Sequence, residues 1–305
     1  MSNLFYSAAK LLEIIESKKL NGIHEAVLNY EMELTGRTSA EILSEVIKRY
    51  NVMKEAAFSV LNDPKNIKTK VSDPSSIKIK NALEKGDLKL LNSAIVLKAN
   101  LYAIAVMECN ASMGRIVAAP TAGSAGILPG CMIAMQEAYN LSDEKIAEAI
   151  LVSAGIGIVI ASNATFSAAQ AGCQAEIGAS SCMTAAAIGH LQNLTPTQLI
   201  TASALSLQNM LGLACDPIGG LVEVPCIKRN GFGVANAFNA IDMSHMGLIS
   251  EIPFDEVVDA MNNVAKNMNS NIRETAKGGL AITPTAKKLV LEYLERKKKE
   301  KAETN

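Results

Sequence analysis

"LTPTQLITASALSLQNMLGLACDPIGGLVEVPCIKRN", residues 194–230, contains a helix and its abrupt end. Thr195 followed by proline is typical of a helix start, and Gly212 is typical of a helix stop. The residues that follow include Asp-Pro, Gly-Gly and a further proline, with Cys215 and Cys226 near the two ends. The stretch therefore predicts a helical protein whose helices are interrupted here, with a thiol on each side of the interruption.

Similar helix starts recur along the chain, whereas alternation typical of strands does not. Thr38 with Glu41 three residues later forms a capping box, and Ser142 stands before acidic residues at the start of an apolar run. Hydrophobic residues make up 49% of the 305 residues, but aromatic residues only 4%, and Trp is absent. This composition favours close-packed helices over a sandwich or barrel. We therefore predict an all-α fold.

Changes in composition divide the chain into three parts. Residues 1–65 have helical periodicity and form a predicted N-terminal helical segment. Residues 66–85 are polar, turn-rich and lysine-rich, which is typical of a linker or mobile loop. Residues 86–305 are dense in Ala, Gly, Ser and Thr among apolar residues, and we predict that they form the main helical domain.

Charge and cysteine usage exclude several functional classes. The formal net charge of −1 gives no electrostatic footprint for nucleic acid. No targeting segment is recognisable, and the apolar run at residues 149–162 is too short for a membrane span. We therefore expect a cytoplasmic protein without a membrane partner. In that compartment the six cysteines are expected to be free thiols or metal ligands.

A loop rich in small residues lies within "ECNASMGRIVAAPTAGSAGILPG", residues 108–130. Such a loop ahead of a helix can present backbone N–H donors to an anion. Its glycine spacing matches neither a P-loop nor a dinucleotide fingerprint. A tight turn between two helices is the alternative interpretation.

The cysteines alone indicate a metal only weakly. Cys173 lies between a glycine and a glutamine, and ten residues separate Cys215 from Cys226, which fits neither a zinc knuckle nor a ferredoxin run. Buried packing is the alternative for each thiol. The remaining cysteines are Cys109, Cys131 and Cys182. The histidines, none of which is placed as an obvious partner, are His24, His190 and His245.

Four stretches taken together resemble the alpha chain of iron–sulfur-dependent L-serine dehydratase. They are "NASMGRIVAAPTAGSAGILPG", "AGCQAEIGAS", "LGLACDPIGGLVEVPCIKRN" and "RETAKGGLAIT", and they occur in this order within residues 86–283. The resemblance implies an all-helical catalytic domain whose loops hold a 4Fe–4S cluster. It also implies that the cluster ligands are Cys173, Cys215 and Cys226. The other three cysteines, Cys109, Cys131 and Cys182, lie outside these positions, and we interpret them as packing residues.

The chemistry implied by the resemblance is conversion of L-serine to pyruvate and ammonia by elimination of water. Three cysteines on four irons leave one iron open, which can act as a Lewis acid on the substrate hydroxyl. The general base is not assigned, because the family's serine- and histidine-bearing motif lies on a separate domain; a separate beta chain is therefore implied. Candidates for contact with the substrate are Thr121, Gly123, Ser124, Gly126, Asn110, Arg115, Arg273 and Lys277.

The chain departs from the family's pattern at two main places. "VSDPSSIKIKNA", residues 71–82, contains no glycine where relatives have a glycine-rich loop, and residues 208–210 read Gln-Asn-Met where many relatives have an acid and a histidine. Two alternatives therefore accompany the main hypothesis. One is a related iron–sulfur lyase acting on another small amino acid, such as a cysteine desulfhydrase. The other is a non-catalytic iron–sulfur or redox-sensing subunit.

Overall fold

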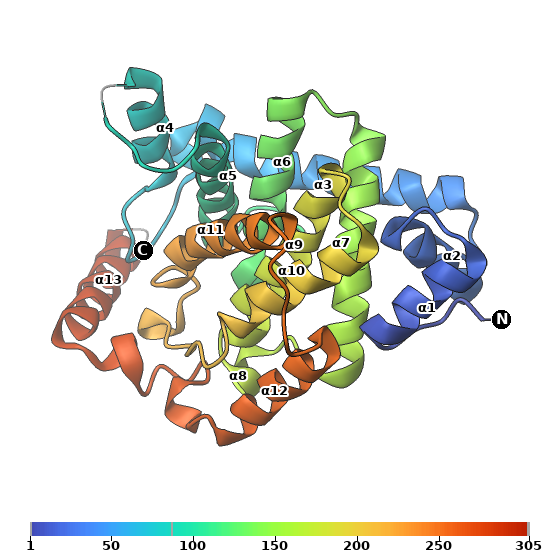
Figure 1. The fold of residues 1–305 in the computed structure, drawn as a ribbon. Coiled ribbons are helices and arrows are strands. Elements are labelled where there is room, and N and C mark those ends of the chain that lie inside the picture. The colour runs from blue at the N-terminus through green and yellow to red at the C-terminus, as the bar shows by residue number, and fades with distance from the viewer. Residues whose placement is uncertain (1, 87, 304–305) are drawn as a thin grey trace.

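The computed structural model describes residues 2–86 and 88–303, and within these ranges it contains helices and no strand, which confirms the predicted all-α class (Figure 1). The only extended pairing in this part of the chain is an isolated bridge between Cys215 and Arg273. The α-helices are α1 (Ala8–Lys18), α2 (Ile23–Thr35), α3 (Ser39–Asn62), α4 (Ser76–Lys85), α5 (Ala94–Ala111), α6 (Ile127–Tyr139), α7 (Asp143–Asn163), α8 (Ala168–Ala171), α9 (Ala179–Leu191), α10 (Pro196–Gln208), α11 (Cys226–His245), α12 (Phe254–Asn267) and α13 (Pro284–Glu303).

The predicted helix starts are confirmed. Thr38 and Thr195 each form a capping box. In each box the threonine hydroxyl accepts from the backbone N–H three residues later, and the side chain of that later residue accepts from the N–H of the threonine. Ser142 caps α7 by accepting from the N–H of Lys145. These caps fix where α3, α7 and α10 begin.

Helix α9 is the centre of the core. It is buried along almost its whole length and packs against α6, α7, α10 and α11. Its sequence, "ASSCMTAAAIGHL", consists mostly of small residues, so neighbouring helices can approach it from every side. The same use of small residues brings α5 and α6 together, because a Cβ at Gly130 would lie 2.6 Å from the carbonyl oxygen of Ala99.

The N-terminal helices belong to the same core. Helices α2 and α3 pack against α7, and α3 also packs against α5. Their buried side chains, among them Leu11, Val27 and Tyr50, form one continuous apolar cluster with those of α5 to α12. Figure 1 shows α1 and α2 on the opposite side of the molecule from α13. The division into residues 1–65, 66–85 and 86–305 remains a prediction.

Residues 66–85 include the helix α4, which packs against α5. The segment before α4 runs alongside the end of α5 and the loop ahead of α11, through hydrogen bonds described below. The predicted linker thus contains a helix and is attached to the core on both sides.

Two core helices are long and apolar enough to cross a membrane by length and composition alone. They are α5 and α7, and 61% of the most apolar window of each is buried inside the protein. Helix α7 includes the apolar run at residues 149–162 and extends beyond it, chiefly through its polar first turn, which begins at Asp143. Burial against other helices explains the apolar character of both.

Candidate metal and substrate site

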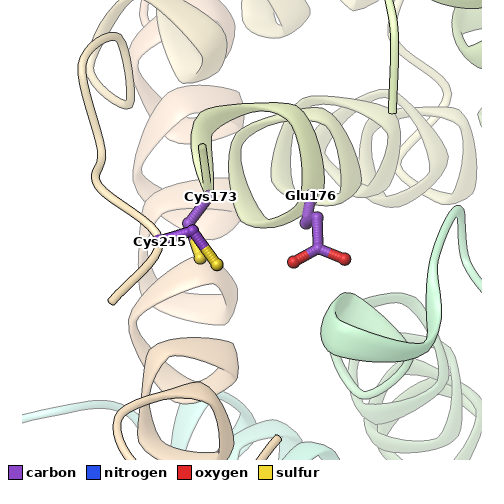
Figure 2. A group of neighbouring side chains, drawn as sticks. All are labelled: Cys173, Glu176 and Cys215. Atoms are coloured by element: carbon purple, nitrogen blue, oxygen red, sulfur yellow. The ribbon is translucent and has the colours of Figure 1, made fainter. Parts of the chain in front are cut away.

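Two of the three predicted metal ligands lie together with a carboxylate. Sulfur atoms of Cys173 and Cys215 and a carboxylate oxygen of Glu176 all lie within 4.8 Å of one another (Figure 2). Both cysteines are 2% exposed, and Glu176 is partly exposed. Two soft thiol donors and a carboxylate at this spacing could hold a metal ion.

Cys173 is positioned by a break between two helices. Gly172 ends α8 with a φ of 71°, and Cys173 then precedes a π-helical turn, Gln174–Gly178, that runs into α9. A Cβ at Gly172 would lie 2.8 Å from the carbonyl oxygen of Leu213, so glycine is required for this approach. The turn therefore holds Cys173 directly against the chain that leads to Cys215.

Cys215 is held by backbone bonds on both sides. Its N–H donates to the carbonyl of Ile272 at 2.8 Å, and its carbonyl accepts from the N–H of Glu274 at 2.8 Å. The buried amide of Gln174 accepts from the N–H of Gly212 at 2.9 Å, just before this segment. The predicted interruption is thus held at Gly212 and Cys215, and its Gly-Gly part forms a short 3-10 turn, Ile218–Gly220.

Cys226 is the first residue of α11 and is 6% exposed. It does not join the group of three at 4.8 Å, but Asn230 donates both to its carbonyl and to the carbonyl of Gly123, in the loop that contacts Glu176. Arg229, one turn further along α11, donates to the sulfur of Cys173 at 3.5 Å and to the carboxylate of Asp216 at 2.9 Å. The helix that begins with Cys226 therefore contacts Cys173 and the residues on either side of Cys215.

The three thiols differ in their tendency to ionise. A hydrogen bond with Cys215 lowers the pKa of Cys173 against the effect of burial, and the guanidinium of Arg229 lowers it further. The same hydrogen bond raises the pKa of Cys215, together with burial, and burial raises the pKa of Cys226 to about 12. Cys173 is thus the thiol prepared to become a thiolate, which is the form that binds metals.

The predicted small-residue loop lies next to this group. The side chain of Asn230, on α11, accepts from the N–H of Gly126 at 3.0 Å and donates to the carbonyl of Gly123 at 3.0 Å and to that of Cys226 at 2.9 Å. Asn110, on α5, donates to the carbonyl of Ala122 at 2.9 Å. These amides fix the loop against the turn that carries Cys226.

The loop touches Glu176 directly. The hydroxyl of Thr121 donates to Glu176 at 2.6 Å, and a Cβ at Gly123 would lie 2.7 Å from the other carboxylate oxygen. The Ser124 hydroxyl is fully buried, 3.1 Å from that of Thr121 and 3.5 Å from the carbonyl of Ala119. Burial raises the pKa of Glu176, and the bond from Thr121 opposes this effect. Among the predicted substrate contacts, Thr121 and Gly123 therefore lie at the metal-ligand group.

The predicted basic residues are distributed differently. Arg273 follows Ile272, whose carbonyl accepts from the N–H of Cys215. The guanidinium of Arg273 donates to the carbonyl of Gln170 at 3.2 Å, and its Nε is buried without a partner among the described residues. Lys277 is exposed. Arg115 is also exposed and forms its ion pair with Glu55, on α3. Contact with the substrate remains a prediction for each of the eight residues.

Two buried carboxylates that the sequence reasoning missed hold the segment before α4. Glu223, 2% exposed and three residues before Cys226, accepts backbone N–H groups from Lys70, Val71 and Ser72 at 2.8–3.1 Å. Glu108, on α5, is fully buried and accepts from the N–H groups at 75 and 76 and from a serine hydroxyl. The glycine-free segment is therefore bound to the cysteine-bearing loop. For Glu108 the sequence did carry a signal, because this glutamate lies within a mostly apolar helix.

The departure at residues 208–210 has structural partners. Gln208 donates to the hydroxyl of Ser250 at 2.6 Å, and Asn209 donates to Asn236, on α11, at 2.8 Å. Met210 packs beside Gly178: a Cβ added to Gly178 would lie 3.0 Å from the Cβ of Met210. These side chains connect α10 to α11 and to the π-helical turn.

The cysteines that we interpret as packing residues do not belong to the group of three. Cys131 and Cys182 are fully buried, and Cys109 is 5% exposed beside α3. The rings of His24 and His190 lie against each other at a tilt of 47°, with centroids 4.7 Å apart, and His190 contacts Glu148 at 3.3 Å. His245 is exposed at the end of α11.

Comparison with known proteins identifies the family. The family model for the serine dehydratase alpha chain matches residues 18–281. The chain is 41% identical to the probable L-serine dehydratase, alpha chain, of Bacillus subtilis, over 94% of both chains. It is 38% identical to the L-serine dehydratase, alpha chain, of Peptoniphilus asaccharolyticus, over 94% of this chain and 98% of that one. It is also 38% identical to the L-serine dehydratase of Helicobacter pylori, over 92% of this chain and 62% of that longer one. The chain belongs to the serine dehydratase alpha chain family.

Proposed function

We propose that this chain is the alpha subunit of an L-serine ammonia-lyase, which converts L-serine to pyruvate and ammonia. The proposal is supported by full-length similarity to two proteins named as L-serine dehydratase alpha chains. The structural observation that carries it is the convergence of Cys173, Cys215 and Glu176 beside the loop at residues 120–126. We infer that the protein acts in the cytoplasm.

A 4Fe–4S cluster held by Cys173, Cys215 and Cys226 is part of the proposal. The donor set fits such a group: three thiols come from three segments, and Arg229 offers a positive charge to one of them. Soft thiolates are the ligands that iron–sulfur clusters use. When bound, a cluster with one iron free of protein ligands supplies a Lewis acid for the substrate hydroxyl.

The chain's own residues would bind and orient the substrate. The N–H groups of Ser124, Ala125 and Gly126 already donate to Thr121, Ala122 and Asn230. The start of the loop, at Ala122 and Gly123, is therefore our candidate for the N–H groups that receive the substrate carboxylate. Arg273 is the candidate cation, because its buried Nε has no partner among the described residues.

The reaction itself removes the α-proton and the β-hydroxyl of serine as water. The resulting aminoacrylate tautomerises to an imine, which takes up water and releases ammonia and pyruvate. We assign the α-proton to none of the described residues around Cys173. We propose that a beta chain supplies the group that accepts this proton, and the greater length of the Helicobacter pylori relative, of which this chain covers 62%, supports a second region in the working enzyme.

The test is reconstitution. The chain is purified anaerobically, alone and with a beta chain encoded by the same genome, and pyruvate formation is followed with lactate dehydrogenase and NADH. We expect pyruvate from L-serine when both chains and iron are present, and much less sulfide from L-cysteine. An iron-loaded complex that forms no pyruvate from L-serine would overturn the proposal. Faster turnover of L-cysteine would favour a desulfhydrase.

A further inference from the structure

Glu176 occupies a position that the metal ligands alone do not explain. It lies three residues after Cys173 on the π-helical turn, and in Figure 2 its carboxylate points to the same side as the sulfurs of Cys173 and Cys215. One oxygen accepts from the hydroxyl of Thr121 at 2.6 Å. The carboxylate therefore stands between the thiols and the proposed substrate loop.

No cation balances this carboxylate. Within residues 2–86 and 88–303, Glu176 takes part in no ion pair, whereas the nearby Arg229 is already paired with Asp216. Burial raises the pKa of Glu176, and the negative charge of Glu274 raises it further. A partly buried carboxylate is costly to keep ionised unless a cation joins it.

The substrate brings such a cation. L-serine carries a carboxylate, a hydroxyl and an ammonium group, and the proposed site already accounts for the first two. The ammonium needs an anionic acceptor close to both, and Glu176 touches the loop and adjoins the thiols. Asp216 cannot serve, since it accepts from Arg229 and from the N–H of Leu280.

We propose that Glu176 binds the α-ammonium group of the substrate and thereby makes the site select amino acids over hydroxy acids. This inference rests on the proposed function. Glu176 acts in it as a substrate-binding residue: the three proposed cluster ligands are thiols, and the Glu176 carboxylate already accepts from Thr121. The expected specificity comes from leaving a buried carboxylate unpaired when the ammonium is missing.

The experiment uses the anaerobically prepared complex of alpha and beta chains and two unreactive analogues. α-Methyl-L-serine has no α-proton, and hydroxypivalate has the same shape with a methyl group in place of the ammonium. Calorimetry is expected to show that the wild type binds the amino compound roughly 10- to 100-fold more tightly. In Glu176→Gln the preference should fall to near unity through weaker binding of the amino compound, with unchanged iron content. The proposal is overturned if the wild type binds both analogues equally. It is also overturned if the wild type binds neither analogue although it turns over L-serine.

Two further variants separate direct contact from other causes. Glu274→Gln removes a neighbouring negative charge but no contact, and it should keep the preference. Gly123→Ala places a Cβ against the Glu176 carboxylate and should reduce the preference without loss of iron. Loss of iron from Glu176→Gln would identify Glu176 as a metal ligand and overturn the proposal. The proposal also fails if Glu176→Gln keeps the wild-type preference for the amino compound, or if Glu274→Gln loses that preference as fully as Glu176→Gln does. If the wild-type complex forms no pyruvate from L-serine, the proposed function fails first, independently of these comparisons.

Discussion

The carboxylate of Glu223 offers a direct way to test how the cysteine-bearing loop is held. It is 1% exposed as a side chain, and it accepts three backbone N–H groups and the hydroxyl of Ser72, with the ammonium of Lys70 at 3.7 Å. Its own carbonyl accepts the N–H of Ile227 in the first turn of α11. One residue thus connects residues 70–72 to the start of the helix that carries Cys226.

The substitution Glu223→Gln keeps the shape but removes the charge and turns an NH₂ group toward N–H donors. Removing one partner from a buried charged network costs about 3 kcal/mol or more, because the remaining groups stay buried and unsatisfied. That free energy corresponds to roughly a 100-fold loss of hydrogen-exchange protection at residues 70–72. The amides of these residues therefore report the effect locally.

The assay is hydrogen exchange followed by mass spectrometry, together with urea unfolding of the cluster-free chain. The exposed Glu251, in the turn before α12, provides the matched control, and Glu251→Gln should change neither measurement. If Glu223→Gln unfolds at the same urea concentration as this control and keeps the protection of residues 70–72, the reasoning about Glu223 is wrong.

Three further predictions concern the core and the site. Burial lowers the pKa of His190 to about 4. As the pH falls from 6.5 to 4, the unfolded chain therefore binds a proton at this histidine that the folded chain does not. The free energy of unfolding should fall by about 3 kcal/mol over this range. Urea unfolding across this range should show the loss flattened in His190→Gln and unchanged in His245→Gln. Gly130→Ala should lower the free energy of unfolding by about 2 kcal/mol, because its Cβ meets the backbone of α5; equal stability would contradict the packing described. Arg229→Gln removes the donor to the sulfur of Cys173 and should speed iron release to a chelator about tenfold; an unchanged rate would show that the guanidinium does not stabilise the thiolate.

The sequence predicted the features that depend on local chemistry. Capping residues such as Thr195 and Ser142 marked helix starts, because their side chains bond to N–H groups within the same turn. The break after α10 was also foreseeable, since Asp-Pro and Gly-Gly do not continue a helix. The all-α class followed from composition and from the lack of strand alternation.

Contacts between distant segments could not be predicted in the same way. Nothing local to Glu223 indicates that it will meet residues 70–72, about 150 positions earlier in the chain, and its pairing depends on how α4 and α11 pack. Glu176 was present in a quoted motif, yet its place beside Cys215 arises from the meeting of two loops.

The most direct test of the central claim is the iron and sulfide content of single cysteine variants. The wild-type chain, reconstituted anaerobically, should hold about four irons and four sulfides and show the visible absorption of a cluster. Alanine at Cys173, Cys215 or Cys226 should abolish most of both, whereas Cys131→Ala, at a fully buried thiol on α6, should keep them. Full iron content in any of the first three variants, or equal loss in Cys131→Ala, would contradict the assignment of the cluster to these three thiols.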